Sequence, residues 1–461
     1  MGIVVSLMQT IVVPLIPSLP TMLNSSAANA SWVITVTLLA GAIITPISGR
    51  LGDMFGKRLM LVLSLILLTG GSIVCAVSDS LLPMVLGRGL QGLAMGAIPL
   101  GIGIMRDELP REKMGAAVAT MSATMGVGGA IGLPASAAIA QFADWHTLFW
   151  AAAGLGLLSL ASVLFLIPRS AMRTPARFDY LGALGLAAGL VALLLPVSKG
   201  ATWGWGSALT LSCFGAALIL LLLWGFHELR STSPLVDLRI SARPPVLFTN
   251  LASIAVGFSM YAMNLAFPQL LMAPASTGYG MGLSMLQAGL VLTPGGLMMM
   301  AISPVSAKLS ARSSPKVTLI TGTAVIGAGY VLVLVLNSQM WHLALASMVI
   351  CTGIGLAFAA MPALIMSAVE QRETGAANGL NALMRSVGTA VSAAVTGVVL
   401  ASMSITVGKI AVPTLAGFQV SFVLAIASAL LAIVLALFIP RAGKLWRVST
   451  SSTRKSVSAK V

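Results

Sequence analysis

Charged residues are scarce in this sequence. Only 8% of its 461 residues are charged, with 11 acids against 26 lysines and arginines, whereas soluble domains carry about 25%. Hydrophobic residues make up 58% of the chain, and its mean hydropathy is +1.01. So few charges exclude an ordinary water-exposed surface. The composition therefore indicates a polytopic membrane protein.

Residues that carry catalysis or bind metals are scarce too. Three cysteines sit singly in different apolar segments and offer no CxxC spacing, and three histidines lie near segment ends: Cys75, Cys213, Cys351, His146, His227 and His342. We interpret the cysteines as small buried hydrophobes. No phosphate-binding GxxxxGK[ST] loop is present, so ATP is not the expected driver. We predict no enzyme activity, no metal and no cofactor.

Long hydrophobic runs are abundant. Each is long enough for a helix to cross a bilayer, which takes about 20 residues, and the short alternating strands of a membrane barrel are not seen. We therefore predict an all-α membrane protein with fourteen transmembrane helices. The expected spans are 2–22, 31–49, 59–77, 81–104, 114–140, 147–167, 179–198, 207–226, 246–272, 283–307, 317–336, 341–366, 375–403 and 416–439.

The basic residues are distributed unevenly among the connections. All but four of the 26 fall in the even-numbered connections or in the tail; Arg88 and Arg385 lie within spans, and Lys199 and Lys409 lie in odd connections. This asymmetry predicts that the even connections and both termini are cytoplasmic. The positive charge then serves topology and anionic headgroups, and no nucleic acid partner is expected.

Two longer polar connections divide the chain. They flank spans seven and eight, which predicts two six-helix bundles separated by a helix pair, an arrangement of six, two and six. The expected units are residues 1–168, 178–227 and 245–440, followed by a basic, disordered tail at 441–461. The chain begins inside its first span and has no charged start, so we expect no secretory signal and infer that a few residues precede Met1.

A short basic motif, GRLGDMFGKR, joins spans two and three. Its Gly49, Asp53, Gly56, Lys57 and Arg58 closely resemble the cytoplasmic signature of the major facilitator superfamily. The resemblance implies that Asp53 contacts the N-terminal end of a helix from the other half, and span thirteen is the expected partner. The alternative is a solvated salt bridge within the loop.

The fourth span contains RGLQG, similar to the RGxQG pattern of the same superfamily, in which the arginine is implicated in proton coupling. Arg88, Gln91 and Met95 are spaced to share one helical face. A charge in a membrane span indicates function. The alternative is that Arg88 extends its side chain to the outer membrane surface.

Polar side chains form stripes on two later spans. Asn378, Asn381 and Arg385 share one face of span thirteen, and Asn250, Ser253, Gly257, Tyr261 and Asn264 share one face of span nine. Such stripes are expected to face a cavity or neighbouring helices, because lipid would leave them unsatisfied; ordinary hydrogen bonding between helices is the rival interpretation. We predict that substrate contacts Gln9, Gln91, Tyr261, Asn264, Asn378, Asn381 and Arg385.

Fourteen spans with an extra central pair further resemble the drug:proton antiporter branch of the superfamily. Span five reads GVGGAIGLPASAA, with Gly132 and Pro134, similar to the glycine-proline motif of that branch. The resemblance covers essentially the whole chain and implies coupling or gating roles for these two residues, together with the GRLGDMFGKR residues and Arg88.

One position departs from that branch. The first span reads LMQTIVVPLIP, and Met8 stands where the branch usually has an aspartate. No acid lies in a span interior, so the cavity is expected to favour anionic, zwitterionic or neutral amphiphiles attracted to Arg385 and Arg88. The proton carrier stays open among Asp53, Asp79, Asp144 and a carboxylate of the substrate.

These observations together predict a monomeric transporter of the bacterial inner (plasma) membrane. It is expected to export small amphiphilic compounds by alternating access, driven by proton entry. The alternative is an uptake or uniport carrier of an organic anion. A membrane sensor that transports nothing is disfavoured by the two intact motifs.

Overall fold

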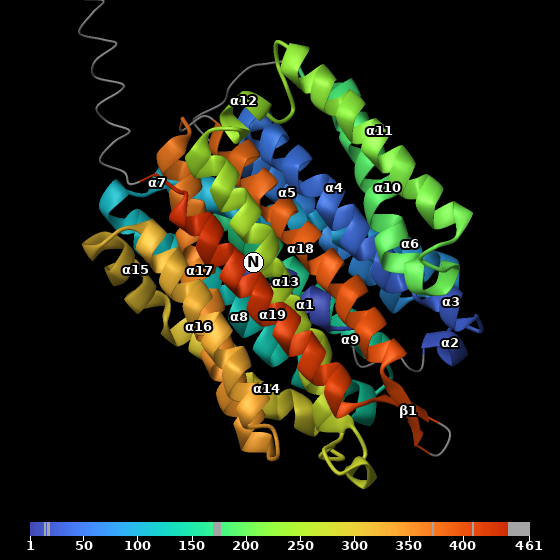
Figure 1. Ribbon diagram of the computed structural model, residues 1–461. Coiled ribbons are helices and arrows are strands. Elements are labelled where there is room, and N and C mark those ends of the chain that lie inside the picture. The colour runs from blue at the N-terminus through green and yellow to red at the C-terminus, as the bar shows by residue number, and fades with distance from the viewer. Residues whose placement is uncertain (13–14, 16–18, 169–176, 371–372, 408–409, 441–461) are drawn as a thin grey trace, which may run out of the picture.

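The computed structural model describes the 461-residue chain except residues 13–14, 16–18, 169–176, 371–372, 408–409 and 441–461. The expected tail therefore lies outside the described residues. Figure 1 shows a bundle of long helices with a helix pair on one flank. The first part of the chain forms α1 (Gly2–Thr10), α2 (Leu19–Met22), α3 (Ala27–Ala30), α4 (Trp32–Phe55), α5 (Lys57–Ala76), α6 (Leu81–Leu93), the 3-10 turn η2 (Ala94–Gly96), α7 (Ala97–Glu108), α8 (Arg111–Phe142) and α9 (His146–Leu166).

The flanking pair and the second part follow. They are α10 (Tyr180–Trp203), α11 (Ala208–Arg230), α12 (Leu238–Ser241), α13 (Pro244–Met272), η3 (Ala275–Thr277), α14 (Met285–Ala301), α15 (Ser303–Arg312), α16 (Pro315–Val335), α17 (Met340–Ala368), α18 (Thr374–Ser402), β1 (Ser404–Val407), β2 (Ile410–Pro413) and α19 (Leu415–Leu437).

Thirteen helical stretches in the described residues are long and apolar enough to cross a membrane. They match the expected spans two to fourteen, and α6 to α7 and α14 to α15 each count as one stretch. The first expected span contains two short helices, α1 and α2, separated by residues that are described only in part. The protein is thus a helical multi-pass membrane protein in which thirteen of the fourteen expected crossings have a matching long helix.

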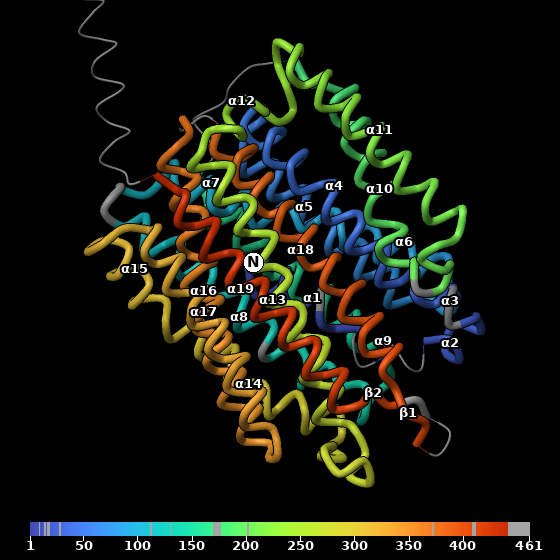
Figure 2. The backbone as a smooth tube through the Cα atoms, in the orientation of Figure 1, coloured from blue at the N-terminus to red at the C-terminus, as the bar shows by residue number. Residues whose placement is uncertain are grey.

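Two structural features differ from the expectation. The antiparallel hairpin of β1 and β2 pairs Ile405 with Val412, and Figure 2 shows it beyond the end of α18. Its β-branched residues favour strands, but the run is too short to stand out beside two long spans. In addition, α10 continues past the expected end of span seven, so Lys199 lies inside a helix and is only 4% exposed. Its ammonium contacts the Ser31 hydroxyl and lies 4.7 Å from the centroid of the Trp32 ring.

The helices form two packed groups. One apolar core joins α1, α5, α6, α7 and α9, and another joins α13, α16, α17 and α19. The groups meet along two seams, where α4 packs on α18 and α8 packs on α14. The α10–α11 hairpin lies on the flank, with α10 against both α4 and α18.

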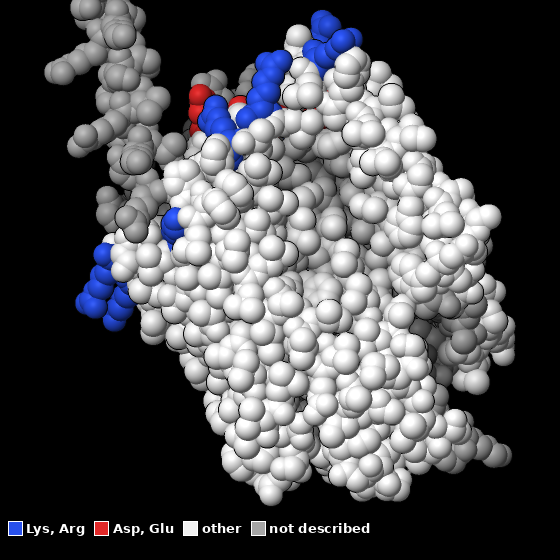
Figure 3. All heavy atoms as spheres, in the orientation of Figure 1, with Lys and Arg blue, Asp and Glu red and all other residues white. Residues whose placement is uncertain are grey.

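Most described basic side chains lie at one end of the bundle. Figure 3 shows lysines and arginines gathered at that end, above a broad surface without charge. We call it the basic end; it contains the connections at residues 56, 109–110, 231–243 and 313–314. The opposite end contains the β hairpin and the connections at 77–80, 143–145, 204–207 and 336–339.

Candidate functional site

A cavity of about 240 Å³ is lined by residues of α4, η2, α7, α8, α10, α13 and α18, and thus by helices of both packed groups and of the flanking pair. Leucine, isoleucine, alanine and methionine side chains form most of its wall, and Met95, Met125 and Met260 are among them. Methionine adapts to irregular shapes. The cavity therefore suits an apolar group of variable form.

Among the residues that the structure describes, Arg385 is the only charged one that lines this cavity. Its guanidinium lies 4.6 Å from the centroid of the Phe358 ring, and among the described residues it has no hydrogen bond or ion pair. The α18 backbone at Arg385 packs directly on Gly257 of α13, where any Cβ would collide with the Arg385 carbonyl. The helices thus hold an unpaired cation against a mostly apolar space.

The polar side chains on one face of α18 differ in their partners. Asn381 donates through Nδ2 to Asn250 Oδ1 at 2.9 Å and to Ser253 Oγ at 2.7 Å, which joins α18 to α13. Asn378 donates to the Thr374 carbonyl at 3.0 Å, whereas its Oδ1 has no partner among the described residues. Both asparagines and Arg385 line a second space of about 20 Å³ next to the cavity. Hydrogen bonding between helices therefore explains Asn381, and Arg385 remains available to a ligand.

The other predicted substrate contacts are placed differently. Tyr261 lines the cavity. Asn264, about one turn further along α13, is exposed and lines neither space. The side chain of Gln9 lies outside the described residues.

Arg88 and Gln91 form a buried network away from the cavity. Arg88 donates to the carbonyls of Met8 at 3.1 Å and Val33 at 3.3 Å and to Gln91 Oε1 at 2.7 Å. Gln91 in turn donates to Ser72 Oγ at 2.8 Å. Arg88 is 2% exposed, so the interpretation that it extends to the membrane surface is wrong. These two side chains point toward α1, α4 and α5, and neither lines the cavity. Met95 does line it, because α6 ends at Leu93 and the 3-10 turn η2 breaks the helical face that the spacing predicted for all three residues.

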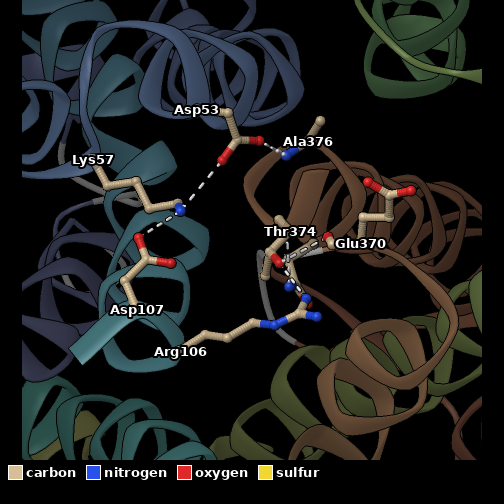
Figure 4. Close-up of polar contacts among 8 residues, drawn as sticks. Asp53, Lys57, Arg106, Asp107, Glu370, Thr374 and Ala376 are labelled. Atoms are coloured by element: carbon tan, nitrogen blue, oxygen red, sulfur yellow. Dashed lines mark hydrogen bonds and ion pairs between the residues drawn. The ribbon is translucent and has the colours of Figure 1, made fainter. Parts of the chain in front are cut away.

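The GRLGDMFGKR motif meets α18 at the basic end (Figure 4). Asp53 Oδ2 accepts a hydrogen bond from the Ala376 amide at 3.0 Å, in the first turn of α18. Lys57 Nζ lies 3.5 Å from Asp53 and 2.7 Å from Asp107. The expected contact between Asp53 and the start of span thirteen is present, and the carboxylate lies where a helix N-terminus favours negative charge.

The glycines of the motif allow α4 to pack closely against the start of α18. A Cβ at Gly49 would collide with the Gly375 carbonyl, and Gly56 has φ of 104° at the turn between α4 and α5, a conformation that glycine adopts without strain. Arg58 donates to the Leu164 carbonyl at 2.7 Å and so joins α5 to α9.

Arg106, which the sequence pattern did not single out, completes the contact. Its guanidinium donates to the carbonyls of Met366 at 3.1 Å and Val369 at 3.2 Å, at the end of α17, and it also contacts the Thr374 hydroxyl. A cation is favoured at a helix C-terminus. Asp53 and Arg106 therefore bind oppositely charged ends of two consecutive helices. We call Asp53, Arg106 and these helix ends the latch.

Gly132 and Pro134 lie in the second seam. A Cβ at Gly132 would collide with Thr10 of α1. On the other side of α8, Pro134 Cα lies 3.2 Å from the position of a Cβ on Gly289 of α14. The motif therefore packs α8 closely against both α1 and α14.

Two acids at the opposite end share one histidine. His146 lies 2.5 Å from Asp144 and 3.3 Å from Asp79, and its hydrogen bonds lower the pKa of the Asp144 carboxyl. Neither acid lines the cavity.

Comparisons with known proteins agree on one family. The model of the Major Facilitator Superfamily matches residues 1–393 and 251–460. The tetracenomycin C resistance and export protein of Streptomyces glaucescens is 28% identical over 403 residues, which is 86% of this chain and 74% of that protein. An uncharacterized MFS-type transporter of Mycobacterium tuberculosis is 26% identical over 82% of this chain, but the chain spans only 55% of its length.

A solved structure shows the same fold. The human organic anion transporter MFSD10 (TETRAN) matches with a TM-score of 0.66, covering 94% of this chain and 97% of that protein. The sequence identity is 16%, so the likeness concerns the fold alone.

Proposed function

The chain belongs to the Major Facilitator Superfamily of transporters, and on that premise we propose that it exports small amphiphilic compounds in exchange for protons. A relative named for tetracenomycin C resistance and export supports the direction of transport. Another, the multidrug transporter protein MdtP of Bacillus subtilis, is 24% identical over 78% of this chain and supports a broad substrate range.

The surroundings of Arg385 are the main support for the proposed substrate class. Within the described part of the chain it is a cation in the cavity wall without a hydrogen bond or ion pair, and no acidic residue lines either space. A buried charge without a partner is unfavourable, so a bound anion stabilises the arginine, and a bound cation is repelled. The proposed substrates are therefore amphiphiles with a carboxylate, a sulfonate or a zwitterionic head, whose apolar part fills the methionine-lined space.

Alternating access requires that one end opens while the other is closed. We propose that the basic end is cytoplasmic, in agreement with the positive-inside rule, and that the chain works in a bacterial inner membrane. The latch then closes the cytoplasmic side, and the arrangement corresponds to the outward-facing state. The division into residues 1–168, 178–227 and 245–440 is part of the same proposal, and the two separate cores support it.

Asp53 is our candidate for the group that links proton binding to the latch. It is 3% exposed, and its Oδ1 has no hydrogen bond among the described residues, only the ion pair with Lys57 Nζ at 3.5 Å. A proton on this carboxyl removes the negative charge that the α18 terminus favours, which weakens the latch. Asp79 and Asp144 lie at the opposite end and lack such a connection to α18.

A uniport or uptake carrier of an organic anion is the second candidate function. The unpaired Arg385 supports it equally well, because recognition of an anion does not fix the direction of transport. One experiment distinguishes the antiporter from the uniporter. Proteoliposomes are loaded with an anionic naphthalenesulfonate, and its flux is followed with and without an imposed pH gradient. Accumulation against a concentration gradient, only when the pH gradient is present, supports the antiporter. Equilibration alone supports the uniporter.

A further inference from the structure

The α10 helix belongs to the pair between the two bundles, yet it forms part of the cavity. Leu194, Val197 and Ser198 from α10, and Trp205 from the turn that follows, all line the same space as Arg385. These positions form a part of the wall that neither six-helix bundle provides, and α10 packs against both α4 and α18, which line the same cavity.

The part of α10 between the basic end and the cavity packs into the seam between α4 and α18. Leu186, Leu190 and Leu194 follow one another at intervals of four residues and belong to one buried cluster with Ala42 of α4 and Leu383 of α18. This spacing gives one apolar face along the helix. The helix therefore rests between the two bundles and continues from a packed seam into the wall of the cavity.

The connections of α10 to the two bundles differ in kind. On the α4 side, the hydroxyls of Ser198 and Thr35 lie 2.8 Å apart, and Lys199 contacts Ser31 and the Trp32 ring. The apolar cluster contacts both α4 and α18, so these polar contacts on the α4 side are additional to it. Hydrogen bonds require a narrow range of distances and angles, so they fix the position of α10 relative to α4. The helix is thus held to the first bundle.

Trp205 closes this wall near the opposite end. Its ring packs over Gly200, where an added Cβ would lie 2.8 Å from the ring. The indole is 37% exposed and lines the cavity. An aromatic side chain at this position limits the length of an apolar group that extends away from Arg385.

We propose that α10 is a specificity-determining part of the transport site, in which Val197 and Trp205 set the size of the apolar group that an anionic amphiphile can carry. This inference rests on the proposed function, because it takes the space at Arg385 as the substrate cavity. During transport α10 moves with α4 and slides past α18.

The test uses purified, reconstituted protein and naphthalenesulfonates that carry alkyl chains of increasing length. Val197→Phe adds volume to the wall, so we expect export of the long-chain members to fall about tenfold while short-chain members are retained. Trp205→Ala removes the ring and is expected to extend export to longer chains. Leu184→Phe on the exposed face of α10 and Trp203→Ala, which is outside the cavity wall, serve as controls and should keep the wild-type profile.

Arg385→Ala, measured with the same series, distinguishes a failure of the proposed α10 role from a failure of the proposed function. If Arg385→Ala loses export but Val197→Phe and Trp205→Ala keep the wild-type chain-length profile, the role of α10 is overturned and the proposed function stands. A uniform loss at all chain lengths in both α10 variants also overturns a size-setting role. If Arg385→Ala has no effect on export, the proposed substrate class is overturned, and the α10 proposal that rests on it is overturned with it.

Discussion

Two arginines inside long helices, the buried Arg88 and the half-buried Arg385, have opposite surroundings. Arg88 binds two backbone carbonyls and an amide oxygen, whereas Arg385 has only an aromatic contact among the described residues. The sequence shows both as single charges with polar neighbours at helical spacing. It cannot distinguish them, because the partners of Arg88 come from the distant residues Met8 and Val33. The same holds for Arg106, whose partners on α17 are about 260 residues away.

Replacing Arg385 tests recognition of the substrate. Because Arg385→Ala breaks no hydrogen bond among the described residues, we expect the melting temperature in detergent to stay within a few degrees. Export of anionic amphiphiles should fall at least about tenfold, since one charge-assisted contact contributes about 1.5–3 kcal/mol. Arg385→Lys is the matched control and should retain part of the activity. Unchanged anion export by Arg385→Ala would contradict the assignment.

Replacing Arg88 tests structure instead. Arg88→Ala removes the donor to the Met8 carbonyl and to the Gln91 amide oxygen, whereas the Val33 carbonyl keeps the Thr37 hydroxyl as a donor. Each buried unsatisfied group costs about 1–3 kcal/mol, so we expect a clear drop in the melting temperature. A variant that melts like the wild type but loses only proton coupling would show that the network acts mainly in transport.

At the scale of helices, the latch joins the motif to α17 and α18. Asp53→Asn keeps the size of the side chain and removes its charge, which is worth up to about 2 kcal/mol at a helix N-terminus. We expect transport to fall about tenfold while the melting temperature changes little. Glu108→Gln serves as control, because Glu108 is an exposed acid at the same end of the bundle. Near wild-type transport by Asp53→Asn would remove Asp53 from the mechanism.

The residue before α18, Glu373, is an acid whose charged form destabilises the folded state. Glu373 precedes the helix without capping it, and burial, followed by the charges of Glu370 and Asp237, raises the pKa of its carboxyl above the ordinary value of 4.5. The folded state therefore binds this proton more tightly than the unfolded state does, so the stability it contributes at low pH is lost as pH rises above 4.5.

Glu373→Gln should remove this dependence. We expect its melting temperature to exceed that of the wild type above that pH and to vary less with pH in the acidic range. Melting curves of both proteins across this range measure the difference. Parallel curves would contradict an unfavourable charge at Glu373.

The helices themselves follow closely from the sequence. Apolar runs and the basic connections between them predict thirteen of the long helices, because bilayer thickness fixes the length of a span. The extension of α10 through Lys199 was not predictable. Hydropathy counts a lysine as a boundary, and its burial depends on groups distant in the sequence, among them the Trp32 ring and the Ser31 hydroxyl.

At the scale of the whole molecule, the sequence predicts the family, and the structure adds the geometry of the cavity. The motif spacing indicated a contact between Asp53 and span thirteen, but it did not indicate that α10 lines the cavity. A wall formed by an inserted helix depends on how three distant segments pack, and single-sequence patterns do not contain that information.

The central claim is that an unpaired arginine in the cavity selects anions for proton-coupled export. Its most direct test is the dissipation of a preformed pH gradient in everted membrane vesicles by matched anionic and cationic amphiphiles, for the wild type and Arg385→Ala. We expect anionic or zwitterionic compounds to discharge the gradient in the wild type and Arg385→Ala to lose this response. Discharge by the cationic compounds, equal in both proteins, would contradict it.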